Sequence, residues 1–252
     1  MKRNLIYYCY FENGEINEFT KLNLELLNRY CNLFNGQKII KIALDDLTKD
    51  YSNLVGLFEG FDVEVLQNNK ENRESEYFIE SIKEIKDTNS ITFFAHNKGG
   101  SNRPESDVIK LWLFSMYFFN LEPMYLLTIQ DQLSNDKIFS GIMQITTPCP
   151  PWVSSDWHYS GTFFWFNTEK LLSIENWDVM EKNRFAVESY PGSKVKQDKS
   201  HVTMCSANFN FNTYSPEIWK KILTSHSLGQ EMFDNFMKIY THHITPSIIN
   251  YE

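Results

Sequence analysis

The sequence predicts an α/β protein with a mainly parallel central sheet flanked by helices. Two short apolar runs, residues 5–11 and 38–44, have the composition of buried strands. Between them, apolar side chains recur every three or four residues, as on one face of a helix: Leu22, Leu26, Leu27, Tyr30 and Leu33. A strand, a helix and a second strand in this order form a β-α-β unit, which makes the two strands parallel.

The same alternation continues through the first hundred residues. Asn35 and Gly36 supply a helix stop before the second strand. The next elements are a short amphipathic segment at 51–58, a strand at 62–66, a helix at 75–85 and a strand at 91–95. Because ligands of open parallel sheets bind beyond the carboxyl ends of the strands, residues that follow these strands are the first candidates for a site.

The second half is less regular. Asp107 can cap a helix whose apolar residues are Ile109, Leu111, Trp112, Met116 and Phe119. The apolar run at 111–127 is interrupted by Asn120, Glu122 and Pro123, so we expect a buried helix and not a membrane span. Prolines at 148, 150 and 151 mark a loop before an aromatic strand at 157–166. With 252 residues, we expect one domain.

Composition excludes several classes of function. A net charge of -8 argues against a general nucleic-acid binder, which needs a broad basic surface. The four cysteines form no CxxC pair, which predicts neither a zinc site nor a redox dithiol and favours a reduced, cytoplasmic setting. The first apolar run is short and has no small-residue cleavage site, so we expect no secretory signal. Neither GxGxxG nor GxxxxGKS occurs, which disfavours Rossmann dehydrogenases and P-loop enzymes.

A basic, glycine-containing turn follows the strand at 91–95. His96 and Asn97 come directly after the strand, and Lys98 and Arg103 supply two cations. A diphosphate is bound by such charges and by backbone amides that glycines expose, so we predict that these four residues contact a phosphorylated ligand. The alternative is a solvated turn whose basic residues face water.

Polar residues also follow the second and third strands. Asp45 comes at the end of the strand at 38–44, directly after it, and it could accept a hydrogen bond from a base or a ribose or cap the next segment. Asn69 and Arg73 lie in the polar loop at 68–74, which precedes a helix. We predict that both contact a nucleotide, with an ordinary surface loop as the alternative.

An aromatic segment later in the chain has the residue types that bind sugars, namely flat apolar rings beside hydrogen-bonding groups. Its candidate residues are Trp157, His158, Tyr159, Ser160, Gly161 and Trp165. Alternation along a strand would turn some of these rings into the core. For His158, a hydrogen-bonded structural histidine is an equal alternative.

Arg184 and Glu188 are spaced to share one face of a helix. Glu188 could take a proton from an acceptor hydroxyl, and the alternative is a helix-face ion pair with Arg184. The remaining histidines have no ligand spacing, so we predict no metal site.

Taken together, the chain resembles bacterial glycosyltransferases of capsule and lipopolysaccharide synthesis with GT-A-like folds, over most of its length. The stretches that carry the resemblance are RYCNLFNGQKIIKIA, ENRESEYFIESI, ITFFAHNKGGSN, IKLWLFSMYFF, WHYSGTFFWFNTEKL and NRFAVESYPG. The corresponding family pattern is a strand ending in AHxKG, a later HxSGxFWW, and an arginine followed by a glutamate near a glycine. Here Phe164-Trp165-Phe166 replaces the paired tryptophans.

The resemblance implies transfer of a sugar from a nucleotide-diphosphate donor to a glycan or lipid-linked saccharide in surface polysaccharide synthesis. It implies a nucleotide-sugar-binding half at about 1–105 and an acceptor-binding half at about 106–252. Many such enzymes end the fourth strand with an Asp-x-Asp metal site, whereas this chain has His96-Asn97-Lys98. We therefore expect no required cofactor and leave dependence on a divalent metal open.

In this interpretation Lys98, with Arg103, stabilises the leaving diphosphate. Glu188 deprotonates the acceptor in an inverting reaction, and His158 is the reserve base. We expect a cytoplasmic protein that is free or bound at the inner face of the membrane. Two alternatives remain, a sugar nucleotidyltransferase and a non-catalytic carbohydrate-binding protein that uses only the aromatic surface.

Overall fold

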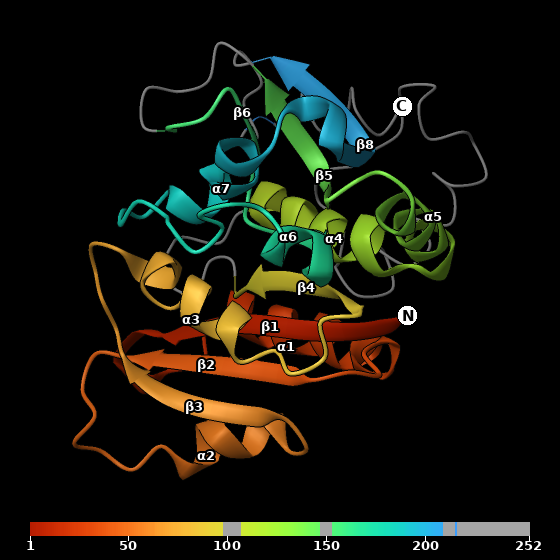
Figure 1. Cartoon of the computed structure of the whole chain (residues 1–252). Helices are drawn as coiled ribbons and strands as arrows, with labels where there is room; N and C mark the ends of the chain where they lie inside the picture. The colour runs from red at the N-terminus through yellow and green to blue at the C-terminus, as the bar shows by residue number, and fades with distance from the viewer. Residues whose placement is uncertain (98–106, 147–152, 209–214, 216–252) are drawn as a thin grey trace.

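The computed structural model describes residues 1–97, 107–146, 153–208 and 215. An eight-stranded sheet runs through it in the order β3-β2-β1-β4-β7-β5-β6, with β8 beside β5 (Figure 1). The strands are β1 (Lys2–Phe11), β2 (Lys38–Leu44), β3 (Asp62–Gln67), β4 (Ser90–His96), β5 (Phe139–Thr146), β6 (Trp157–Tyr159), β7 (Phe164–Asn167) and β8 (Ser200–Asn208).

The first four strands are all parallel. In the middle of this part, Tyr7 of β1 lies opposite Ile40 of β2 on one side and Ala95 of β4 on the other. The chain moves outward from β1 to β2 and β3 and then returns to the other side of β1, so the strand order reverses between β1 and β4. β7 pairs antiparallel with β4, and β8 pairs parallel with β5. The predicted α/β fold with a mainly parallel sheet is confirmed.

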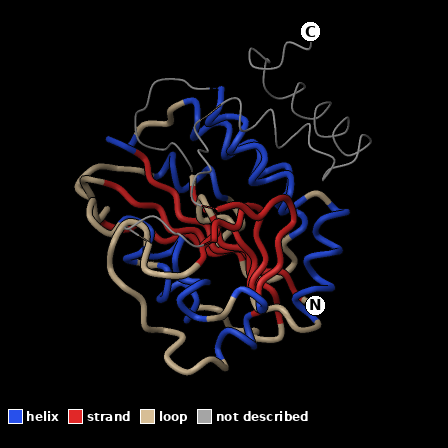
Figure 2. The backbone as a smooth tube through the Cα atoms, turned by 90° about the horizontal axis from the view of Figure 1, so that it is seen from above, coloured by secondary structure: helices blue, strands red, loops and turns tan. Residues whose placement is uncertain are grey.

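Helices cover both faces of the sheet, as the view in Figure 2 shows. Helices α1 (Glu18–Tyr30), α2 (Ser52–Val55), α4 (Asp107–Leu121) and α5 (Pro123–Ser134) pack on one face. Helices α3 (Phe78–Lys83), α6 (Thr168–Leu172) and α7 (Ala186–Lys194) pack on the other. Five short 3-10 turns also occur, at Glu12–Gly14, Cys31–Leu33, Gly56–Phe58, Arg73–Glu76 and Gln197–Lys199.

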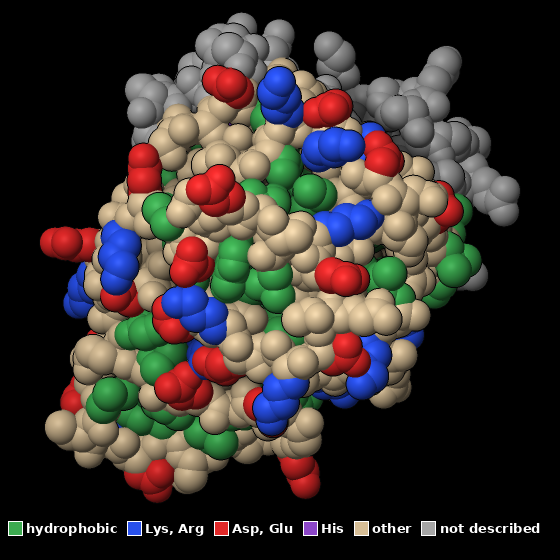
Figure 3. All heavy atoms as spheres, viewed as in Figure 1, with side chains coloured by type: hydrophobic (Ala, Val, Ile, Leu, Met, Phe, Trp, Pro, Cys, Tyr) green, Lys and Arg blue, Asp and Glu red, His purple; other side chains and the backbone are tan. Residues whose placement is uncertain are grey.

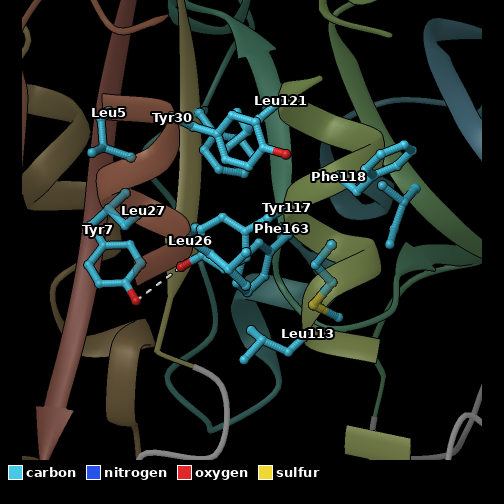
Figure 4. Close-up of a cluster of buried hydrophobic side chains, with 14 of the residues drawn as sticks. Leu5, Tyr7, Leu26, Leu27, Tyr30, Leu113, Tyr117, Phe118, Leu121 and Phe163 are labelled. Carbon is cyan, nitrogen blue, oxygen red and sulfur yellow. Dashed lines mark hydrogen bonds between the residues drawn. The ribbon is translucent and has the colours of Figure 1, made fainter. Parts of the chain in front are cut away.

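The first face carries a core of leucines and aromatic rings between β1, α1 and α4 (Figure 4). Leu26 and Leu27 of α1 are almost fully buried, and burial of such a side chain contributes about 1.5–3 kcal/mol. Within this apolar core the hydroxyl of Tyr117 donates to that of Tyr7 at 3.2 Å, and the hydroxyl of Tyr7 donates to Oδ1 of Asn23 at 3.5 Å, so both buried phenols have partners. The ring of Phe163 packs edge-on against Tyr117 at 5.2 Å, which ties the turn before β7 to α4.

The second face has its own aromatic cluster and one buried cation. Phe78 of α3 packs edge-on against Phe94 of β4, with ring centroids 4.7 Å apart. Lys41 of β2 is 3% exposed and forms ion pairs with Glu64 of β3 and Glu84 after α3. Burial alone would lower the pKa of Lys41, but the hydrogen bonds to the two carboxylates raise it, so the ammonium stays charged. This pair of contacts holds the end of α3 on the sheet.

Two predicted elements are divided in the structure. The apolar run at 111–127 is two helices, because α4 ends at Leu121 and α5 begins at Pro123, where proline suits the first turn. The aromatic strand predicted at 157–166 is two strands, β6 and β7, because residues 160–163 form a tight turn between them. Within the described part of the chain, none of the helices combines the length and apolar character that a bilayer crossing requires.

Acidic and basic side chains are interspersed on the face of the molecule seen in Figure 3. Small apolar patches lie between them. Such an arrangement gives this face no broad basic surface of the kind that binds nucleic-acid backbones.

Candidate functional site

Polar side chains gather where β1, β2 and β3 end, at the carboxyl edge of the parallel strands. Asp45 follows β2 and accepts hydrogen bonds from the Tyr10 hydroxyl at 2.7 Å and from the Asn68 amide at 2.9 Å. Partial burial alone would raise the pKa of Asp45, but these bonds from Asn68 and Tyr10 lower it. Burial and the bond to Asp45 raise the pKa of Tyr10, so the phenol stays protonated. Asp45 is therefore ionised at this edge, with the ammonium of Lys70 at 3.9 Å.

Arg73 brings a cation to the same edge. It begins the 3-10 turn after β3 and has a left-handed backbone, with φ of 52°, held by a hydrogen bond from its amide to the Asn69 carbonyl at 2.7 Å. Such a conformation is unfavourable for a residue other than glycine. The positive charge of Arg73 opposes the rise in the pKa of Tyr8 and of Tyr10, as expected for a cation at the same edge of the sheet. Among the described residues, no carboxylate forms an ion pair with it.

His96, Gly161 and Glu188 are brought together from three distant parts of the chain. His96 ends β4, and its Nε2 lies 3.2 Å from the carbonyl oxygen of Gly161 and 3.3 Å from the hydroxyl of Thr162. The amide of Gly161 donates to Oε1 of Glu188, on α7, at 3.1 Å. On the other side of His96, Nδ1 lies 3.9 Å from the buried carboxylate of Glu74. This set places a carboxylate of the second half beside the end of β4.

The turn that joins these residues has an unusual backbone. Gly161 has φ of 98° and Thr162 has φ of 60°. A Cβ at position 161 would lie 1.8 Å from Cε of Met116, so the Met116 side chain, or the turn, would have to move to accept it. The turn therefore strongly favours glycine at 161, and side chains of α4 pack against it.

The three predicted sugar-stacking rings are buried, so that prediction is wrong for them. Trp157, Tyr159 and Trp165 are exposed by 2%, 1% and 0% of their surfaces. Nε1 of Trp157 donates to the Val195 carbonyl, and Nε1 of Trp165 donates to the Asn120 carbonyl, both at 3.0 Å. These rings face the covered sides of the sheet, where α7 and α4 pack on them, and they hold the core together.

His158 is buried on β6, opposite Ile145 of β5. Burial lowers its pKa to about 4, so the imidazole is neutral near pH 7 and accepts a proton less readily than an ordinary histidine. This property does not favour the predicted role of His158 as a reserve base. We therefore leave it out of proton transfer.

The amide side chains of the two predicted asparagines are used within the protein. Asn97 is 4% exposed, and its side chain accepts from the Tyr10 amide at 2.8 Å and donates to the Tyr10 carbonyl at 2.6 Å. It thus extends the pairing of β1 with β4, and the prediction that it contacts a donor is wrong. The Asn69 side chain accepts from two backbone amides of its own loop and donates to Glu76 at 3.1 Å. A ligand contact by the half-buried Asn69 stays a prediction.

Ser160 and Arg184 keep their predicted roles as hypotheses. Ser160 lies in the turn, where its amide donates to the Met143 carbonyl at 2.9 Å. Arg184 is exposed and precedes α7, so it does not share a helix face with Glu188 as predicted. Its guanidinium lies over the ring of Phe185, at 4.7 Å from the centroid. Lys98 and Arg103 lie outside the described residues.

The described residues contain no group of three histidine, cysteine, aspartate or glutamate side chains that could hold a metal ion. A pocket of about 680 Å³ lies at the amino edge of the strands, where Lys2, Asn4, Lys38 and Asp62 line it. That edge is opposite to the one where Arg73, His96 and Glu188 lie.

Sequence patterns missed four residues of this site: Tyr10, Asn68, Glu74 and Thr162. Tyr10 comes at a strand end, where the rule for open sheets could have singled it out, and Asn68 begins the polar loop that this rule did indicate. Glu74 had only the signal of an acidic residue in a polar loop. Thr162 had none, because a left-handed threonine is not visible in a sequence.

No family model matches the chain, and none of the curated proteins matches it. Among solved structures, it is similar to a 4-diphosphocytidyl-2C-methyl-D-erythritol synthase from Anaerococcus prevotii, with 8% identity and a TM-score of 0.44 over 94% of this chain and 96% of that one.

A Desulfovibrio desulfuricans protein provisionally called a nucleotide-diphospho-sugar transferase shows 7% identity and a TM-score of 0.41, over 96% of this chain and 97% of that one. A further 4-diphosphocytidyl-2C-methyl-D-erythritol synthase shows 10% identity and a TM-score of 0.40, over 95% of this chain and 99% of that one. At these values the similarities assign no function, which must come from the residues of the chain itself.

Proposed function

We propose that the protein is a glycosyltransferase that moves a sugar from a nucleotide-diphosphate donor to a saccharide acceptor. The observation that carries the proposal is that Glu188 and Arg73, from different halves of the chain, both belong to the carboxyl edge of the parallel strands. The strand order reverses between β1 and β4, and open α/β sheets bind ligands at such a point. A cation for a phosphate and a carboxylate for a hydroxyl are the two charges that this reaction needs.

The donor would lie along the ends of β1, β2 and β3. Asp45 is ionised and partly exposed, so it can accept hydrogen bonds from a base or a ribose. The guanidinium of Arg73 forms no ion pair with a carboxylate of the described residues. Its planar group can donate two parallel hydrogen bonds to two oxygens of a phosphate. Lys98 follows Asn97 directly in the sequence. We assign to Lys98 the role of stabilising the negative charge of the leaving diphosphate, with Arg103 as a second cation.

Glu188 would be the base that takes the proton of the acceptor hydroxyl while that oxygen attacks the anomeric carbon. Oε1 of Glu188 is held by the Gly161 amide at 3.1 Å, which limits the carboxylate to a small range of orientations. An inverting reaction follows from a base of this kind, because the displacement is direct. The acceptor class, a glycan or lipid-linked saccharide of surface polysaccharide synthesis, is supported by the sequence resemblance.

A sugar nucleotidyltransferase is the second candidate, since it would place cations at the same strand ends. The carbohydrate-binding alternative loses its main support, because the three rings it would use are buried.

The two enzymatic candidates differ in product. A thermal-shift panel of nucleoside diphosphates and nucleotide sugars, with and without chelator, finds the donor because a bound ligand raises the apparent stability. With that donor, a glycosyltransferase releases nucleoside diphosphate. Release of pyrophosphate from a nucleoside triphosphate and a sugar phosphate would overturn the proposal in favour of the second candidate.

A further inference from the structure

A clamp formed by His96, Gly161 and Glu188 holds the turn at residues 160–163 from two sides. His96 contacts the carbonyl oxygen of Gly161 from β4, and Glu188 contacts the amide of the same residue from α7. These are the two polar backbone groups of one residue, so the position of Gly161 depends on both side chains. We call these three residues the Gly161 clamp.

The hydrogen-bond chemistry determines which atom of His96 donates. A carbonyl oxygen only accepts, so Nε2 of His96 must carry the hydrogen that lies between it and Gly161. The Thr162 hydroxyl, 3.3 Å from the same nitrogen, can accept a share of that hydrogen bond. The opposite nitrogen, Nδ1, faces the carboxylate of Glu74, which is 7% exposed. The imidazole therefore lies between a buried carboxylate and the turn.

The turn itself needs to be held. Gly161 and Thr162 both have left-handed backbones, and for threonine this conformation is unfavourable. The turn packs on α4, where the end of the Met116 side chain occupies the space that a Cβ at 161 would need. The ring of Phe163, two residues further on, lies 5.7 Å from the His96 ring. A strained turn keeps one conformation only where the surrounding contacts specify it.

From this arrangement we infer that His96 is a positioning residue, which aims the carboxylate of Glu188 through Gly161 and does not bind the donor. The inference rests on the proposed role of Glu188 as the base. When His96 is removed, Gly161 loses one of its two anchors and the amide that orients Glu188 moves. The sequence prediction of a donor contact at His96 is then replaced by a role in acceptor activation.

Three variants separate these possibilities. In His96→Ala the side chain is lost. In His96→Asn a polar group remains but is too short to reach Gly161. In His96→Gln an amide hydrogen can again approach the Gly161 carbonyl, because the longer side chain extends to about the position of Nε2.

The first measurement is amide hydrogen exchange at residues 160–163, which does not depend on activity. We expect Gly161 exchange to be about tenfold faster in His96→Ala and His96→Asn, and to return toward the wild-type rate in His96→Gln. Unchanged exchange at Gly161 in the folded alanine variant would overturn the clamp. Should His96→Ala fail to fold, the asparagine and glutamine variants provide the same comparison.

The second measurement is a double-mutant cycle with Glu188→Gln. We expect His96→Ala to lower kcat by about tenfold in the wild-type background, with donor affinity unchanged, and to have little further effect in Glu188→Gln. Additive losses, or a loss of donor affinity with normal Gly161 exchange, would make His96 a separate contact and overturn the inference. If the wild-type protein transfers no sugar, the proposed function fails, and the exchange measurement still decides whether the clamp exists.

Discussion

Oε1 of Glu188 accepts a hydrogen bond from the amide of Gly161 at 3.1 Å, which links helix α7 to the turn between β6 and β7. The same glycine is bonded through its carbonyl to His96 at the end of β4. Glu188 is far from His96 in the sequence. Through Gly161, its carboxylate is nevertheless attached to the edge of the sheet where the first four strands end.

Glu188→Gln should keep the bond to the Gly161 amide and lose the base, because an amide oxygen accepts a hydrogen bond but takes no proton near pH 7. We expect donor affinity within about twofold of the wild type and a fall in kcat of about 100-fold or more. Steady-state kinetics and donor titration measure the two quantities. Glu175→Gln, at an exposed position, is the matched control. Near-normal transfer by Glu188→Gln would exclude this residue as the base.

Arg73→Ala should weaken donor binding about tenfold or more, because a charge-assisted hydrogen bond to a phosphate is lost. Calorimetric titration with the nucleoside diphosphate found in the thermal-shift panel gives the dissociation constant. Lys21→Ala, which removes an exposed cation on α1, should leave that constant unchanged. Equal binding by Arg73→Ala and the wild type would place the diphosphate elsewhere.

Lys98→Ala tests a residue outside the described part of the chain. We expect weaker donor diphosphate binding and a loss of turnover, with the fold intact by circular dichroism, because no other cation follows β4 so closely in the sequence. Turnover assays with and without a divalent cation extend the test. If the divalent cation restores turnover of Lys98→Ala, a metal ion can supply the positive charge that the variant lacks.

Gly161→Ala should destabilise the protein by about 1–3 kcal/mol, because the new methyl group meets Met116 and the left-handed backbone disfavours it. Urea unfolding measures the change in the free energy of unfolding. Gly56→Ala is the matched control, since a Cβ there meets nothing within 4 Å and the backbone is right-handed. Equal stability of the two alanine variants would show that the turn can relax.

His158 should make the protein less stable as the pH falls. Burial lowers its pKa to about 4, whereas an unfolded chain has a histidine pKa of about 6.5. Between these values the unfolded state binds more protons, so the free energy of unfolding decreases from about pH 6.5 to about pH 4, by roughly 2–3 kcal/mol in total. His158→Gln should lack this part of the slope. Parallel curves for the two proteins, measured by denaturant unfolding at each pH, would contradict the assignment.

Much of the first half could be predicted from local patterns. The strand at residues 38–44 has the predicted bounds, and β3 exceeds its prediction by only one residue at its end. Apolar periodicity is a local property that a buried strand or helix face imposes on its own residues. The same patterns placed Asp45, Arg73 and His96 at strand ends: His96 is the last residue of β4, and the other two follow a strand directly or within a short loop.

The second half could not be predicted in the same way. Tryptophan and tyrosine are common both in cores and on sugar-binding surfaces, so the residue type does not show which of the two a ring belongs to. Trp157, Tyr159 and Trp165 belong to the core because α4 and α7 cover them. The break between β6 and β7 depends on left-handed backbones at Gly161 and Thr162, of which only the glycine has a sequence signal.

The amino-acid sequence by itself determined the order of strands and helices and the edge of the sheet at which a ligand is expected, since both follow from local periodicity and from the rule for parallel strands. The tertiary structure alone decided that Glu188 reaches His96 through Gly161 and that Asn97 completes a strand pairing. These contacts join residues far apart in the chain. Their geometry depends on how both faces of the sheet are packed, which no local pattern encodes.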